Sequence, residues 1–122
     1  MTGIADTNLV LALFKPTDAL HERAKKHVAR HPGLIVPLSV GLELLVIARK
    51  HGIVHDDLID VVDQHFVLEH RDLLLDAAHA LTEGAIPTAF DAVHAVEAMH
   101  RGTTLHTADD RLLRSEYPTT PF

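Results

Sequence analysis

The hydrophobic and polar positions alternate between short apolar runs and longer segments with helical periodicity. The runs that predict strands are residues 3–5, 34–37, 66–68 and 103–107, and residues 115–122 can supply at most a short edge strand. The segments that predict helices are residues 9–14, 18–30, 39–51, 55–64, 72–83 and 88–101. Strands alternating with helices in this way predict an α/β fold around a small parallel sheet.

Several residues are of the kind that begin or end helices. Asp18, Ser39, Asp56 and Thr88 can each cap the start of a predicted helix, because a short polar side chain can accept a hydrogen bond from the first turn. Gly52 and Gly102 follow basic residues and supply the left-handed conformation that ends a helix. These signals are strongest around the helix that begins near Thr88.

Length and composition bound the class of protein. A chain of 122 residues that is 47% hydrophobic is the size of one ordinary domain. It has no apolar run of about 18 residues and no basic leader followed by an apolar segment, so we expect a cytoplasmic protein without a membrane partner. Cysteine is absent, which excludes disulfides and thiolate metal sites. Any chemistry must come from oxygen and nitrogen groups.

Three acids each stand alone in an otherwise apolar segment. Asp6 is the only acid in the first seventeen residues, Glu43 is the only charge in residues 34–48, and Asp91 is the only formal charge in residues 84–96. Asp91 by itself has a simpler interpretation, as an acid that complements the helix dipole. Together with Asp109, the isolated acids are explained if they converge on a divalent cation, and carboxylates suit Mg²⁺ or Mn²⁺.

The formal charge of -6 argues against a nucleic-acid binder, because phosphate contacts normally require a basic surface. This objection weakens if Asp6, Glu43, Asp91 and Asp109 bind cations, since these four acids then account for most of the excess negative charge. The remaining surface can still carry basic patches.

Four short motifs together resemble the PIN domain. They are Asp6-Thr7-Asn8 after the first predicted strand, Glu43 in a mid-chain helix, Asp91-Ala92 at a helix start, and Thr107-Ala108-Asp109 after a strand. Each motif alone is weak, whereas four acids in this order are more specific. The chain is most similar to the single-domain ribonuclease toxins of the VapC type, and the resemblance covers nearly its whole length.

This resemblance implies one domain over residues 1–122, with a three-layer α/β/α fold and a parallel sheet in strand order 3-2-1-4-5. It also implies an endoribonuclease dependent on Mg²⁺ or Mn²⁺, in which a water activated by the metal attacks phosphorus in line. The implied catalytic residues are Asp6, Glu43, Asp91 and Asp109; of these Asp6, Asp91 and Asp109 would bind the metal, with Asn8 and Thr107 as supporting polar groups. The motif spacing selects Asp109, so that Asp110 is interpreted as an exposed helix-start residue.

The implied partners are an RNA substrate, a cognate antitoxin protein and a second copy of the chain. A homodimer would open its acidic sites on a shared groove. An antitoxin could inhibit the enzyme by inserting an arginine or lysine among the four acids and displacing the cation.

Other functions fit parts of the sequence. A phosphoacceptor receiver domain needs a late lysine, and the last lysine here is Lys50; a haloacid-dehalogenase-type phosphatase needs a second aspartate where the chain has Asn8. A PIN fold without catalysis, acting as a scaffold or an RNA-processing binding protein, stays open. A histidine site is a further alternative, because Asp91 and His94 are three residues apart on one helix face.

Overall fold

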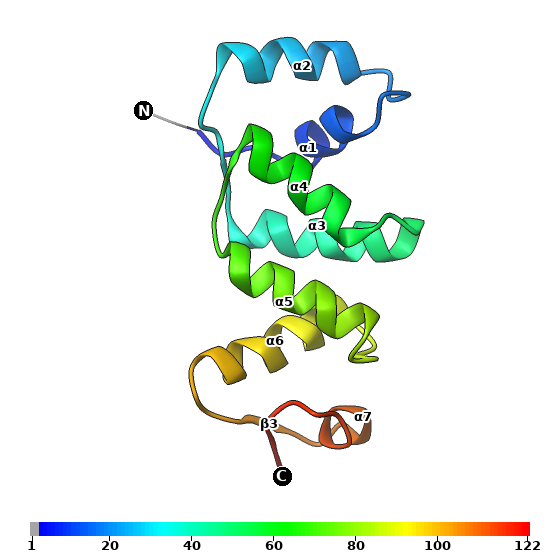
Figure 1. The fold of residues 1–122 in the computed structure, drawn as a ribbon, viewed down its shortest axis with the longest axis vertical. Helices are drawn as coiled ribbons and strands as arrows, with labels where there is room; N and C mark the ends of the chain where they lie inside the picture. The colour runs from blue at the N-terminus through cyan, green and yellow to red at the C-terminus, as the bar shows by residue number, and fades with distance from the viewer. Residues whose placement is uncertain (1–2) are drawn as a thin grey trace. The chain divides into compact units, whose positions relative to one another are not determined.

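The computed structural model describes residues 3–122. Over these residues it contains seven helices and four short strands (Figure 1). The helices are α1 (Thr7–Phe14), α2 (His21–Arg30), α3 (Leu38–His51), α4 (His55–His65), α5 (Arg71–Thr82), α6 (Ala89–His100) and α7 (Asp110–Leu113). The strands are β1 (Ile35–Val36), β2 (Val67–Leu68), β3 (Leu105–Thr107) and β4 (Thr119–Pro121). None of the helices within residues 3–122 combines the length and apolar character that crossing a bilayer requires.

The chain divides into two compact units, Met1–His70 and Arg71–Phe122. The first unit holds α1 to α4 with β1 and β2, and the second holds α5 to α7 with β3 and β4. Each unit is described by itself below.

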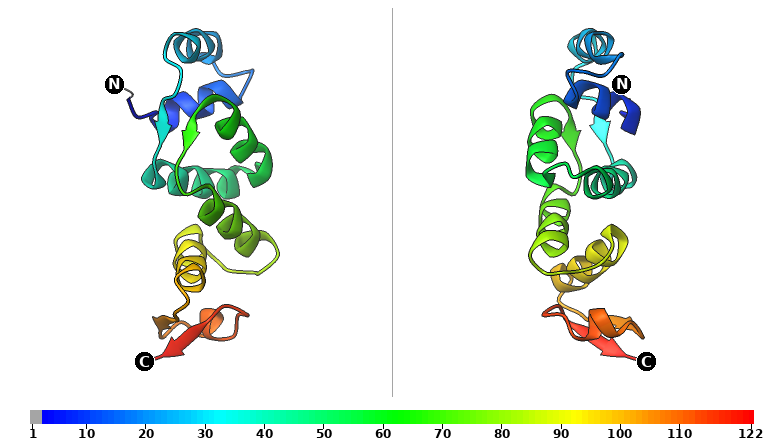
Figure 2. Two further views of the ribbon diagram at one scale, coloured as in Figure 1. Left: turned by 60° about the vertical axis from the view of Figure 1, so that its left-hand side comes forward. Right: turned by 90° about the vertical axis from the view of Figure 1, so that its right-hand side faces the viewer.

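The predicted three-layer α/β/α fold around a parallel sheet is wrong, because helices predominate in the described residues. The described strands form two separate two-stranded parallel sheets, β1 with β2 and β3 with β4, and not one five-stranded sheet in the order 3-2-1-4-5 (Figure 2). The first predicted strand is reduced to a single parallel bridge between Ile4 and Ile35. Pairings of two or three residues supply few ladder hydrogen bonds and bury little, and Ile4 and Val67 remain 67% and 51% exposed. Helices rather than a sheet therefore make most of the core.

The first unit buries apolar side chains between α1, α3 and α4. Its fully buried members include Val10 on α1, Val36 on β1, and Leu58 and Val62 on α4, each 2% exposed or less. Helix α1 also packs against α2, and α3 against α4. This core fixes the start of α1, which carries the first acidic motif.

The second unit is built on close packing of α5 against α6. The buried face of α5 includes Ala77 and Ala80, and that of α6 includes Ala92 and Ala95, all of them fully buried. Small side chains let two helix backbones approach closely. The chain also turns tightly after α5, where a Cβ added at Gly84 would lie 2.9 Å from the carbonyl oxygen of Ala80.

The predicted helix ends are partly confirmed. Thr88 is the N-cap of α6 and accepts a hydrogen bond of 3.1 Å from the Asp91 N–H. Gly52 and Gly102 follow α3 and α6 with φ of +67° and +66°, in the left-handed region where glycine is favoured.

Three predicted N-caps are wrong. The N-cap positions of α2, α3 and α4 are Leu20, Pro37 and Val54, and none of them makes a side-chain capping bond. Asp18 instead accepts from the Leu20 N–H at 2.8 Å, in the turn before α2. Ser39 and Asp56 lie one residue inside their helices, where Asp56 can still complement the helix dipole.

Thr88→Ala should lower the free energy of unfolding by about 1 kcal/mol, because it leaves the Asp91 N–H without its capping acceptor. Urea unfolding followed by circular dichroism measures the change. Ser39→Ala is the matched control and should change stability by less than about 0.5 kcal/mol, since Ser39 caps nothing. A larger loss for Ser39→Ala than for Thr88→Ala would contradict these cap assignments.

Candidate functional site

In the first unit, one threonine connects two of the acidic motifs. Asp6 is the N-cap of α1, and its Oδ1 accepts a hydrogen bond of 2.7 Å from the Thr7 backbone N–H. The Thr7 hydroxyl donates to Oε2 of Glu43 at 2.8 Å, from α1 to α3. Thr7 is only 3% exposed, so its position is fixed by the core. The carboxylates of Asp6 and Glu43 are therefore both bound to a single buried residue.

Each of these two carboxylates keeps one oxygen that is not engaged. Among residues 3–122, neither Oδ2 of Asp6 nor Oε1 of Glu43 has a hydrogen-bond partner. Asp6 and Glu43 are both exposed residues. The pair thus offers two hard oxygen acceptors to a ligand from solvent, and we name it the Asp6–Glu43 pair.

The resemblance to the PIN domain implies a supporting role for Asn8 in this motif and none for Thr7. Asn8 lies at the second position of α1, is exposed, and makes no side-chain hydrogen bond within residues 3–122. The contact of Thr7 with Glu43 joins residues 36 positions apart, so no local signal could have identified it.

In the second unit, Asp91 is the third residue of α6. It is half-buried, while Ala95 and Ala98 on the same helix face are buried and His94 is exposed. The place of Asp91 behind the Thr88 cap also satisfies the simpler interpretation, in which Asp91 complements the helix dipole.

Asp109 is the N-cap of α7. Its Oδ1 accepts from the backbone N–H groups of Arg111 at 2.8 Å and Leu112 at 3.4 Å. The Asp109 N–H donates to the hydroxyl of Thr107 at 3.1 Å, so Thr107 holds the loop from which Asp109 projects. Asp110 is the exposed first residue of α7, the place that the motif spacing predicted.

The four candidate acids are divided between the two units, with Asp6 and Glu43 in the first and Asp91 and Asp109 in the second. Within residues 3–122, no three Asp, Glu or His side chains form a group that could hold a metal ion. Mg²⁺ is commonly bound by one or two carboxylates and keeps waters or substrate phosphates as its other ligands. By donor chemistry and number, the Asp6–Glu43 pair fits this mode of binding.

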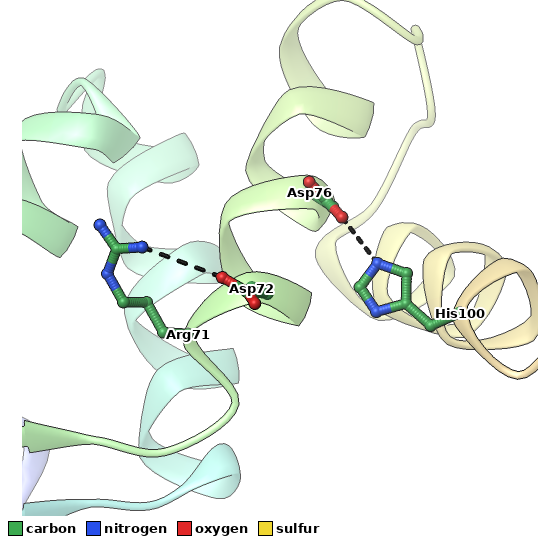
Figure 3. A network of polar contacts seen from close by, with 4 residues as sticks. All are labelled: Arg71, Asp72, Asp76 and His100. Atoms are coloured by element: carbon green, nitrogen blue, oxygen red, sulfur yellow. Dashed lines mark hydrogen bonds and ion pairs between the residues drawn. The ribbon is translucent and has the colours of Figure 1, made fainter.

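The second unit also holds a polar cluster that no sequence motif predicted. It surrounds a hollow of about 280 Å³ lined by Asp76, His79, Glu83, Gly84, Met99, Glu116 and Tyr117. Figure 3 shows Nε2 of His100 at 2.6 Å from Oδ2 of Asp76, and a longer ion pair of 3.9 Å from Arg71 to Asp72. Burial raises the pKa of Tyr117 above 10.0, and the charges of Glu116 and Asp76 raise it further.

No model of a known protein family matches the chain, and no curated protein matches it.

Tyr117 should titrate above pH 10.0, because burial and two nearby carboxylates disfavour the phenolate. The chain has one tyrosine and no tryptophan, so absorbance near the phenolate band reports this residue alone. Since the folded state binds the proton more tightly, this contribution to stability is complete below pH 10 and is lost as the pH rises further.

Glu116→Gln should lower the midpoint of the Tyr117 titration. The midpoint should still lie above that of Tyr117 in the denatured chain, because burial is the larger cause of the raised pKa. A folded midpoint equal to the denatured one would disprove the described environment of Tyr117.

Proposed function

We propose that the chain is a Mg²⁺- or Mn²⁺-dependent endoribonuclease that hydrolyses RNA phosphodiester bonds, of the VapC toxin type. The observation that carries the proposal is the Asp6–Glu43 pair. Two motifs far apart in sequence are brought to one buried threonine, and each carboxylate keeps an oxygen for a ligand.

In this proposal Asp6 and Glu43 hold the cation, and Asp91 and Asp109 are the other candidate catalytic acids by the order of their motifs. A bound divalent cation lowers the pKa of a water molecule and stabilises negative charge on phosphate oxygens. The contribution of Thr7 is positioning. Its two hydrogen bonds restrict both carboxylates, so that less rotational freedom is lost when a cation and a phosphate bind.

The proposal includes the partners and location that such a toxin requires. A ribonuclease active on cellular RNA must be inhibited in the cytoplasm, so a cognate antitoxin belongs to the proposal, as does a homodimer. An antitoxin arginine or lysine could pair with Asp6 and Glu43 in place of the cation.

A second candidate function is an RNA-binding or scaffold protein without catalysis. It is favoured by the lack, within residues 3–122, of a group of three or more metal-ligating side chains. A nuclease assay on structured RNA with Mg²⁺ or Mn²⁺, beside isothermal titration of Mn²⁺, separates the two functions. Cleavage that requires the metal supports the enzyme, and absence of both cleavage and metal binding supports the binding protein.

Asp6→Asn and Asp91→Asn should each reduce RNA cleavage by at least about a hundredfold, because each removes a charge that stabilises the transition state. Both variants should keep the fold, since asparagine also caps helices and Asp91 makes its contact with Thr88 through the backbone. Cleavage rates and circular dichroism spectra measure the two effects.

Asp109→Asn should also reduce cleavage strongly, whereas Asp110→Asn is the matched control with an effect below about threefold. Equal losses at the two positions would show that the wrong acid was chosen, or that both acids act.

Thr7→Val should lower kcat about tenfold to a hundredfold, because valine has the shape of threonine but cannot donate to Glu43. The backbone N–H that binds Asp6 is kept in this variant. Thr7→Ser restores the hydroxyl and should recover most of the activity. Titration calorimetry distinguishes a positioning role from a loss of stability. Thr7→Val should bind Mn²⁺ more weakly than Thr7→Ser does. Identical Mn²⁺ affinities of the two variants would contradict the role assigned to Thr7.

A further inference from the structure

Helix α2 carries a dense set of basic residues in an acidic chain. Four of the eleven lysines and arginines lie between Arg23 and Arg30, and the only acid on the helix is Glu22. Arg23, Lys26, His27 and Arg30 are spaced three and four residues apart, so they lie along one face of the helix. We call these four residues the α2 stripe.

The α2 stripe is exposed and its permanent charges are not neutralised. The helix buries only Ala24 and Val28, and all four stripe residues are exposed. Within residues 3–122, none of the three stripe cations pairs with a carboxylate, whereas Lys25, off the stripe, lies 3.6 Å from Glu22. A concentrated positive face of this kind attracts a polyanion.

A hollow of about 260 Å³ lies beside the stripe, between α1 and α2. Ala12 and Ala24 line it with small side chains that are 3% and 4% exposed. Leu9 and Leu20 add apolar surface, and Leu20 is 49% exposed. The interior of the hollow is thus apolar and open to solvent.

Polar groups complete the lining of this hollow. Arg23 and His27 bring two members of the α2 stripe to it, and Asn8 brings an exposed amide from α1. Asn8 is two residues from Asp6 and adjacent to Thr7 in the sequence, at the start of α1.

We propose that the α2 stripe binds the backbone of an unpaired RNA strand and that the α1–α2 hollow accepts one unstacked base. The inference rests on the proposed endoribonuclease function and specifies its substrate as single-stranded RNA. Arg23, Lys26 and Arg30 contact phosphates. The base enters the apolar hollow, where the guanidinium of Arg23 and the ring of His27 can stack on it and the Asn8 amide can donate to and accept from its edge.

The combination of surfaces favours RNA over an acidic protein. Carboxylates of a peptide would satisfy the cations but would leave the apolar hollow unfilled or solvated. A nucleotide carries a flat apolar face and an anionic phosphate on the same unit, which matches a hollow with cations at its edge. A duplex cannot use the hollow, because its bases are stacked and paired.

The test compares two triple variants of equal charge. Arg23→Gln, Lys26→Gln and Arg30→Gln remove the permanent charges of the stripe. Lys25→Gln, Lys50→Gln and Arg101→Gln form the control, since Lys25 and Arg101 already pair with Glu22 and Glu97 and Lys50 is an exposed residue on α3. Binding of a fluorescent single-stranded RNA is measured by anisotropy in EDTA, so that no cleavage occurs, over a range of salt concentrations.

For wild type, the logarithm of the association constant should fall linearly with that of the salt concentration. The stripe variant should lower the magnitude of this slope by about 2, the value expected when three phosphate contacts to a single strand are lost. The control variant should keep the wild-type slope. Equal slopes for wild type and stripe variant, or equal losses in both triple variants, would overturn the assignment of the α2 stripe to RNA.

The hollow is tested by competition. An unlabelled single strand should displace the probe at about tenfold lower concentration than a duplex of the same sequence, because only the single strand can place a base in the hollow. Leu20→Ala should bring the competing concentrations of single strand and duplex closer together, since it removes apolar lining from the hollow. It should leave the salt dependence of RNA binding unchanged, since it removes no charge. A duplex that competes as well as the single strand would overturn the assignment of the hollow.

The assignment of the α2 surface and the proposed nuclease function can be disproved independently of each other. If wild type cleaves RNA with Mg²⁺ while the stripe variant binds RNA as wild type does, the enzyme stands and the α2 surface is overturned. If the stripe variant loses binding while wild type cleaves nothing with either metal, the α2 surface is supported and the nuclease is wrong.

Discussion

Burial between helices is the constraint on which both units depend. Their strands are two or three residues long, so the sheets cannot bury enough apolar surface to hold a unit together. In the second unit the apolar surface is buried by alanines of α5 and α6 together with Leu74 and Val96, and in the first by side chains such as Leu58 and Val62. Asp6, Glu43 and Asp91 each lie on a helix or helix start that this packing fixes, whereas Asp109 caps α7, which contacts β4.

Three of the four candidate acids lie at helix N-termini. Asp6 and Asp109 are N-caps, and Asp91 is the third residue of α6. Acids are favoured at these positions in any protein, because they satisfy unpaired N–H groups and complement the helix dipole. Glu43 differs, since it lies within α3 and its carboxylate is bound by a hydroxyl from another helix. The contact of Glu43 with Thr7 is therefore the observation least explained by helix stability alone.

Several features that depend on residues close together in the sequence were predicted correctly. Features that depend on contacts between distant residues were not. The ends of α3 at Gly52 and of α6 after Thr88 were predicted correctly, because glycine geometry and threonine capping act within one turn. Ser39 failed as a cap because α3 starts one residue earlier, at Leu38. The five-stranded sheet failed because strand pairing is a long-range outcome, which apolar runs alone do not determine. The Thr7–Glu43 bond was missed for the same reason.

The net charge of -6 is a sum over surfaces of opposite sign, and it does not describe any of them. In the second unit, Asp76, Glu83 and Glu116 line the hollow beside Tyr117. The charges of Asp76 and Glu116 raise the pKa of Tyr117. In the first unit, α2 carries three cations, Arg23, Lys26 and Arg30, that no carboxylate within residues 3–122 neutralises. Screening in physiological salt limits exposed charges to a range of about 8 Å, so a phosphate approaching α2 responds to the local stripe more than to the total charge. An acidic chain can therefore present a surface that is locally cationic, and the argument from net charge against nucleic-acid binding does not apply at α2.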